Sequence, residues 1–278
     1  MTDAAGFIAG ELRAHARDHY LASLYAPDAL RPAVQALYAF DLELARIPRQ
    51  VSEPAMGEIR LQWWLDTLDA MAAGETQPHP VAAALAGAIG MASLPMTALK
   101  DMVEARRTEL YADPLPDMGA LEAHLGHTTA SVIQLASVIL AGPAATAAAE
   151  AAGLAGVALG LTRLLADLPA GHGQQHALIP DTVLEAHSAR RASLGHSDES
   201  GAVLASLIIH AERRLAEARA AHAAVPAAAQ PAFLPVAVAP LWLSRLRQLG
   251  AGAFTTPPPL SPLARQWALW RAARRNRW

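Results

Sequence analysis

The sequence of 278 residues contains no cysteine and only one lysine, Lys100. Without cysteine the chain can form no disulfide, no thiol nucleophile and no cysteine-ligated zinc site. The net charge is −3 and the isoelectric point is near 6.4, so the molecule as a whole has no field that would collect nucleic acid or anionic lipid. These absences favour a reducing, cytoplasmic setting and make any basic site a local feature.

Signals for export and motifs for several enzyme classes are also missing. The first residues have no apolar core of signal-peptide length, and Asp3 and Glu11 argue against a transit peptide. No HExxH, GxSxG or Walker A motif occurs, so metalloprotease, serine-hydrolase and P-loop functions lack support. Three pairs of histidines have helix-face spacing, but each lacks a third ligand, and we expect no metal site from them.

What the sequence does contain is helical periodicity along almost its whole length. Hydrophobic residues make up 53% of the chain, and no stretch alternates as a strand would. We therefore predict an all-α fold, with one helical domain over 1–254 and a Pro-rich connector with a basic final helix over 255–278. The predicted helices cover 3–25, 29–47, 53–73, 80–92, 96–111, 118–141, 144–168, 180–187, 199–223, 230–249 and 261–275.

The almost uncharged segment 129–168 is long enough to raise the question of a membrane span. Pro143 interrupts it, and alanine and glycine dominate where a span would carry leucine, so we predict a buried hairpin. Gly153, Gly156 and Gly160 lie on one side of its second helix, where they would let a neighbouring helix approach closely.

Several pieces of the chain occur in an order that resembles the squalene/phytoene synthase family. They are the LYAF run at 37–40, the Trp63–Trp64 helix, His79–Pro80, the GLTRLLAD helix end at 160–167 and Ile179–Pro180. The resemblance covers most of the chain and implies an isoprenoid-synthase-like helical bundle around a central cavity. In that family two aspartate-rich motifs hold magnesium ions, which bind the substrate diphosphates.

Most of the expected carboxylates are absent from this chain. With the sequences aligned on Phe40, Asp167 is the one that is kept, and the other motif positions fall on Ala45, Arg46, Arg49 and Gly171. Alanine and glycine offer no ligand, and an arginine in place of an aspartate changes the local charge by two units. A unit pair ~4 Å apart is worth about 4 kcal/mol at an effective dielectric of ~20, so magnesium should be repelled.

We therefore expect no cofactor, no catalytic residues and a remnant polar cluster of Asp41, Glu43 and Asp167. Arg46 and Arg49 are expected either to pair with Asp41 or Asp167 or to bind a phosphate group, since guanidinium matches both bidentately. The remaining candidates are Arg60, on the Trp63 helix, and two histidines of the predicted flap. The predicted ligand-binding residues are thus Arg46, Arg49, Arg60, His172 and His176.

One subgroup of the family resembles this sequence more than the synthases do. The runs AFDLELA at 39–45, VSEP at 51–54 and IRLQWW at 59–64 look like the non-catalytic members that are similar to the mitochondrial respiratory complex I assembly factor. This resemblance implies a catalytically degenerate binding or assembly factor, with complex I subunits as partners. It also implies a cytoplasmic protein, with peripheral contact to the inner membrane as an option.

Two alternatives stay open at this point. The first is a head-to-head prenyltransferase that uses prenyl diphosphates and Mg²⁺, with Asp41, Glu43 and Asp167 as a displaced metal site. The second is a lipid-binding protein that keeps an apolar tunnel without chemistry, for a prenyl or other lipid ligand.

The C-terminal segment has a pattern of its own. Leu263, Trp267 and Trp270 share one face of the predicted helix, and the same segment is rich in arginine. Tryptophan at headgroup depth and arginine on anionic lipid would suit a membrane interface. Equally, the tryptophans could pack on the domain while the arginines are solvated. The candidate membrane or partner residues are Trp267, Trp270, Arg271, Arg274 and Arg275.

Overall fold

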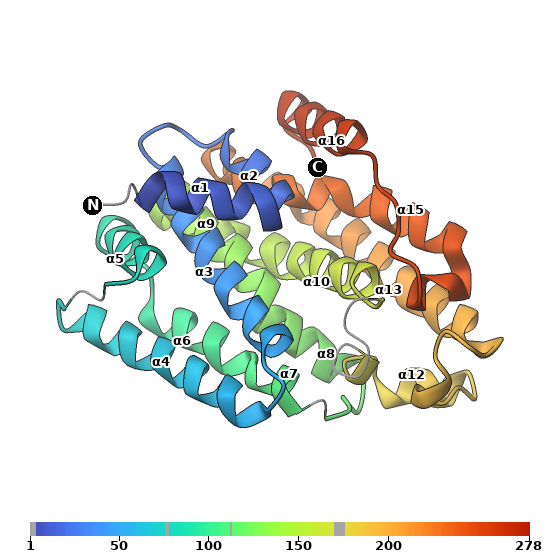
Figure 1. Ribbon diagram of the computed structural model, residues 1–278. Coiled ribbons are helices and arrows are strands. Elements are labelled where there is room, and N and C mark those ends of the chain that lie inside the picture. The colour runs from blue at the N-terminus through green and yellow to red at the C-terminus, as the bar shows by residue number, and fades with distance from the viewer. Residues whose placement is uncertain (1–3, 76–77, 112, 170–175) are drawn as a thin grey trace.

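The computed structural model describes residues 4–75, 78–111, 113–169 and 176–278, and all regular structure in these ranges is helical (Figure 1). The first helices are α1 (Ala4–His15), α2 (Arg17–Ser23), α3 (Arg31–Gln50), α4 (Pro54–Ala72), α5 (Pro80–Ala92), α6 (Met96–Ala105) and α7 (Arg107–Tyr111). The middle of the chain forms α8 (Met118–Leu125), the π-helical turn η1 (Gly126–Ala130), α9 (Ser131–Ala141), the 3₁₀ segment η2 (Gly142–Ala148), α10 (Ala149–Ala166) and α12 (Asp181–Ala186).

The last third completes the bundle with two long helices and several short segments. They are η3 (Arg191–Ser193), α13 (Glu199–Ala220), η4 (Ala221–Ala224), η5 (Ala227–Ala229), α14 (Gln230–Phe233), η6 (Leu234–Val238), α15 (Ala239–Leu249), η7 (Gly250–Phe254) and α16 (Pro262–Arg275). The all-α prediction is confirmed for the described residues.

Helix α10 forms the centre of the bundle. It packs on α13, α9, α15 and the π turn η1, while α3 packs on α1, α5 and α9 beside it. Figure 1 shows α4 and α6 along one edge and α15 and α16 at the opposite one. One apolar core surrounds α3, α5 and α9, and a second lies between α10, α13 and α12. Side chains that project from α3 and α10 into the space between the two cores are therefore carried by helices that are packed on both sides.

Several predicted boundaries are wrong, among them the helix predicted over 96–111, which breaks at Arg106 into α6 and α7. The helix predicted over 3–25 breaks at Ala16, whose backbone leaves the helical region at φ −135° and ψ 52°. The helix predicted to end near Pro48 continues to Gln50 with the proline inside it. Because Pro48 lies in the last turn, the helix loses one amide donor there and can still add two residues. The predicted helix over 118–141 is continuous but contains the π turn η1.

The hairpin of α9 and α10 carries most of the uncharged sequence. Two stretches, Met118–Ala166 and Ala227–Phe254, are long and apolar enough by length and composition to cross a membrane, a test that core helices of soluble proteins also pass. In the first, half of the apolar window is buried inside the bundle (50%), and η2 with Pro143 separates the two helices. The predicted buried hairpin is confirmed, because α9 and α10 pack on each other and on the core.

The glycines of α10 allow η1 to approach this helix closely. A Cβ atom built on Gly156 would lie 2.2 Å from the Cα of Ala130, and one on Gly160 would lie 2.8 Å from Thr129 Oγ1. A Cβ atom this close to backbone cannot be accommodated, so Gly156 requires glycine, whereas Gly160 faces side-chain atoms that could shift. The same prediction is wrong for Gly153, since a Cβ there would meet nothing within 4 Å.

Candidate functional site

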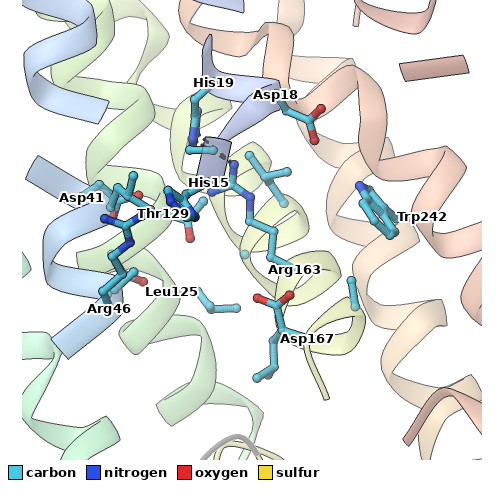
Figure 2. Close-up of a pocket in the computed structure, with 18 of the residues that line it drawn as sticks. His15, Asp18, His19, Asp41, Arg46, Leu125, Thr129, Arg163, Asp167 and Trp242 are labelled. Carbon is cyan, nitrogen blue, oxygen red and sulfur yellow. Dashed lines mark hydrogen bonds between the residues drawn. The ribbon is translucent and has the colours of Figure 1, made fainter. Parts of the chain in front are cut away.

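A cavity of about 430 Å³ opens between α3, α10, the α1–α2 junction and the beginning of α16. Figure 2 shows Asp41 and Arg46 on one wall and Trp242 on the opposite wall, with Arg163 and Asp167 between them. The lining is strongly polar for a space inside a bundle. Its acidic, basic and histidine side chains are His15, Arg17, Asp18, His19, Asp41, Arg46, Arg49, Arg106, Glu109, His124, Arg163, Asp167 and Arg265.

Two ion pairs involve arginines that line the cavity. Arg49 Nη2 donates to Asp167 Oδ2 at 2.8 Å and so joins α3 to the end of α10. Arg46 Nη1 donates to Glu11 Oε2 at 2.6 Å and joins α3 to α1. The pairing of Arg49 with Asp167 is one of the alternatives that the sequence left open, whereas Arg46 pairs with Glu11, which was not among them. Both arginines that replace family carboxylates are thus bonded to acidic side chains of this chain.

A more deeply buried polar network forms the inner wall. Arg106 donates from Nη2 to Asp41 Oδ1 at 2.9 Å and from Nη1 to Glu109 Oε1 at 2.8 Å. His124 Nε2 lies 3.2 Å from the same oxygen of Glu109. The four side chains are only 6–13% exposed. A single guanidinium therefore compensates two buried carboxylates and connects α3 with α7, and His124 adds α8 to the network through Glu109.

The charge of Glu109 depends on this network. Burial alone would raise the pKa of Glu109, but the charge of Arg106 and the hydrogen bond from His124 outweigh it and lower the pKa to about 2. Glu109 therefore stays ionised throughout the neutral and mildly acidic range.

We expect Glu109 to make the fold sensitive to acid. Its pKa in the folded chain, about 2, lies below its ordinary value of 4.5, so its stabilising effect is complete above pH ~4.5 and is lost as the pH falls towards 2. This difference corresponds to about 3 kcal/mol. Urea unfolding at pH 7, 4 and 3 measures it. Glu109→Gln should depend less on pH than the parent over this range, and equal slopes would assign the acid sensitivity to other groups.

Another part of the cavity lining places the neutral ring of His19 beside Arg163. Arg163 Nη2 lies 3.1 Å from His19 Nε2, and the His19 ring packs on Tyr38 with the centroids 4.3 Å apart. Burial, and secondly the charge of Arg163, lower the pKa of His19 well below its ordinary value. The Tyr38 hydroxyl is buried and has no hydrogen-bond partner in the described part of the chain. The cavity thus offers a cation and an unsatisfied hydroxyl close to a neutral ring.

The residues present do not fit the magnesium ions that the family resemblance would imply. Magnesium requires several oxygen ligands in near-octahedral geometry. Asp41 is bonded to Arg106 and Asp167 to Arg49, and Glu43 does not line the cavity. Among the described residues, no three histidines or carboxylates are placed to hold a metal ion. The arrangement suits internal ion pairs better than a divalent cation.

The structure brings together only part of the predicted site. Asp41, Arg46, Arg49 and Asp167 line one cavity, whereas Arg60 and His176, which are also described, do not. Arg60 Nη1 donates to Gln50 Oε1 at 3.2 Å on the outer surface. The ring of His176 packs against Phe254, away from the cavity, with the centroids 5.7 Å apart. His172, like Gly171, lies outside the described residues.

Several important residues of the cavity were not found from the sequence. Arg106, Glu109 and His124 lie 65 or more residues after Asp41, and no local pattern relates them to it. Arg163 could have been found, because it lies one helical turn before Asp167 and shares its face of α10. The two motif regions recognised in the sequence lie on α3 and α10 and form walls of the cavity. The buried counter-ion of Asp41, Arg106, lies in neither region.

Comparison with known proteins identifies a family and several relatives of this chain. The sequence profile of the squalene/phytoene synthases matches residues 12–270. A protein of Bos taurus named "NADH dehydrogenase (ubiquinone) complex I, assembly factor 6" is 28% identical over 266 residues, which cover 92% of this chain and 80% of the relative. The Drosophila melanogaster homolog of this assembly factor is 30% identical over 242 residues, 83% of this chain and 72% of its own.

A solved structure supports the fold. A crystal structure of a dehydrosqualene synthase in complex with ligand superimposes with a TM-score of 0.83 over 98% of this chain and 96% of the synthase chain. The two sequences are 16% identical, so this likeness concerns the fold alone.

Proposed function

Since the chain belongs to the squalene/phytoene synthase family, we propose that it is a member without prenyl-transfer activity that acts as an assembly factor for respiratory complex I. The observation that carries the proposal is the occupation of the cavity carboxylates by arginines. Asp41 is bonded to Arg106 and Asp167 to Arg49. The assembly-factor names of the bovine and Drosophila relatives support the class of partner, namely subunits of complex I.

Electrostatics supports the absence of diphosphate chemistry. A divalent ion ~5 Å from one guanidinium is repelled by about 7 kcal/mol at an effective dielectric of ~20. Bringing such an ion to Asp167 would also require Arg49 to give up its bond. Binding a metal ion here would therefore first require breaking the ion pairs that the protein's own arginines form with the carboxylates.

The same ion pairs give the cavity a structural role in this proposal. They connect α1 to α3, α3 to α10, and α2 to α16 through Arg265 and Asp18, whose Nε and Oδ1 atoms are 2.8 Å apart. These helices surround the cavity, so the ion pairs bridge its walls and add to the packing that orients the helices. A partner protein would then meet a preorganised helical surface. We place the protein in the cytoplasm for this role.

Gene deletion followed by complementation tests the proposed function. Deleting its gene in the native organism should abolish assembled complex I and the oxidation of NADH by membranes, with succinate oxidation as the unaffected control. Both the parent chain and Asp167→Asn should restore assembly. The Arg49–Asp167 pair is 47% and 43% exposed and is worth at most about 1 kcal/mol, so this variant should fold normally.

A biochemical arm separates this function from the prenyltransferase alternative. Purified protein given farnesyl or geranylgeranyl diphosphate with Mg²⁺ should release no diphosphate under conditions in which an active synthase does. Release together with a joined hydrocarbon product, lost in Asp167→Asn, would replace the proposal by the enzyme. Normal complex I in the deleted strain would remove the assembly role whatever the activity.

A further inference from the structure

Helix α16 is fixed on the bundle by its inner face. Ala268, Leu269 and Ala272 are 6%, 1% and 5% exposed, and the helix contacts η6 and α2. Beyond its last turn, Trp278 stacks on Phe233 with the ring centroids 5.1 Å apart and the planes 13° from parallel. With the Arg265–Asp18 ion pair near its beginning, the helix is held at both ends and cannot turn its outer face inwards.

The outer face of α16 carries an exposed apolar stripe, which we call the tryptophan stripe. Leu263, Trp267 and Trp270 are 75%, 60% and 41% exposed. The two indole rings stack on each other with the centroids 4.7 Å apart, and the guanidinium of Arg274 lies over Trp270 at 5.3 Å. Spacings of four, three and four residues place these side chains on one line along the helix. Figure 1 shows α16 at the edge of the bundle, and the exposure of the three apolar side chains places this line on its outer face.

The charge around the stripe is of one sign. The segment 255–278 contains five arginines and no acidic residue, although the whole chain has a net charge of −3. Arg265 is bonded to Asp18, which leaves the other four on the surface: Arg271, Arg274, Arg275 and Arg277. The stripe therefore lies in a locally cationic field that the rest of the molecule does not share.

This combination fits the headgroup region of an anionic bilayer. Indole has an apolar body and a polar N–H, and it favours the depth at which lipid headgroups meet the acyl chains. Arginine binds lipid phosphate bidentately and can keep its charge in the headgroup layer while its methylenes reach below it. A helix with both features on one side lies in the plane of the interface.

We propose that the tryptophan stripe of α16 and the adjoining arginines dock the folded protein on an anionic membrane surface. The docking is peripheral: α16 lies parallel to the surface, the two indoles enter the interface, and the arginines contact phosphate groups. It is independent of the cavity and of the function proposed above, because it uses the opposite face of α16 from the one that packs on the bundle.

Vesicle sedimentation tests the docking with the full-length chain. Vesicles with about one third phosphatidylglycerol in phosphatidylcholine should retain the protein, and pure phosphatidylcholine vesicles should retain about tenfold less. Trp267→Ser with Trp270→Ser should reduce retention on the anionic vesicles by about tenfold or more. The matched control is Ile59→Ser with Ile209→Ser, which removes two residues that are 63% and 62% exposed on other helices and should leave retention unchanged.

A charge variant keeps the test informative if the tryptophan variant does not fold. Arg271→Gln with Arg274→Gln should lower retention on anionic vesicles only, and higher salt should do the same to the parent chain. Equal retention of the parent and both α16 variants would overturn the proposal. The proposal would also be overturned if the parent chain bound neither kind of vesicle but bound a purified complex I subunit through Trp267 and Trp270. The stripe would then be a protein interface.

Discussion

Replacing Arg106 by methionine should lower the free energy of unfolding by about 3–5 kcal/mol. Methionine has nearly the same length, so packing is largely kept while the charge is removed. Asp41 and Glu109 would then be left in a nearly buried position without their shared counter-ion, at 11% and 13% exposure. The loss should be largest at neutral pH, where both carboxylates are ionised, and smaller in acid, where protonation relieves them.

Urea unfolding of the variant against a neighbouring control measures this effect. Arg107 is the next residue along the chain and pairs with Glu58 and Glu104 nearer the surface, with its own side chain 31% exposed. Arg107→Met should cost less than about 1 kcal/mol. If the two variants were equally stable, Arg106 would not be the counter-ion on which the inner wall of the cavity depends.

The second large effect concerns the contact between α10 and η1. Replacing Gly156 by alanine should cost about 3 kcal/mol, because the new methyl group would lie 2.2 Å from the Cα and 2.6 Å from the amide nitrogen of Ala130. Backbone atoms cannot rotate away as a side chain can, so the two helices must move apart. Gly160, one turn further, approaches Thr129 in the same interface and should tolerate alanine better, since side-chain atoms can move.

A glycine of the same helix supplies the control. A methyl group on Gly153 would meet nothing within 4 Å, so Gly153→Ala should leave the fold unchanged or stabilise it by up to ~1 kcal/mol through helix propensity. Thermal or urea unfolding should therefore show a clear loss of stability for Gly156→Ala and none for Gly153→Ala, three residues away. A similar cost for both would mean that α10 does not pack on η1 as described.

The sequence is sufficient for those parts of the fold that depend on local pattern. Helical periodicity predicted the long helices, the buried hairpin around Pro143 and the close approach at Gly156 and Gly160, because each depends on spacing within one segment. It failed at Ala16, where nothing in the local sequence marks a break. It also ended α3 too early, because the effect of Pro48 depends on how many turns follow it.

The cavity was predictable only along its two motif-bearing helices. Asp41 and Asp167 were recognised by their place in α3 and α10, and charge made the pair of Arg49 with Asp167 one alternative beside Asp41 and a phosphate group. The buried counter-ion Arg106 comes from a third part of the chain, 65 residues from Asp41. Which charged residues meet at such a distance depends on tertiary packing, and a single sequence carries no spacing rule for it.

The π turn at 126–130 determines the rotational phase of α8. Deleting one residue there would restore the 3.6-residue period and rotate α8 by about 100° about its axis relative to α9. His124 and Leu125, which now line the cavity, would turn away from it, and Glu109 would lose its contact with His124. The length of this one turn, and no particular side chain in it, therefore selects which residues of α8 the cavity can use.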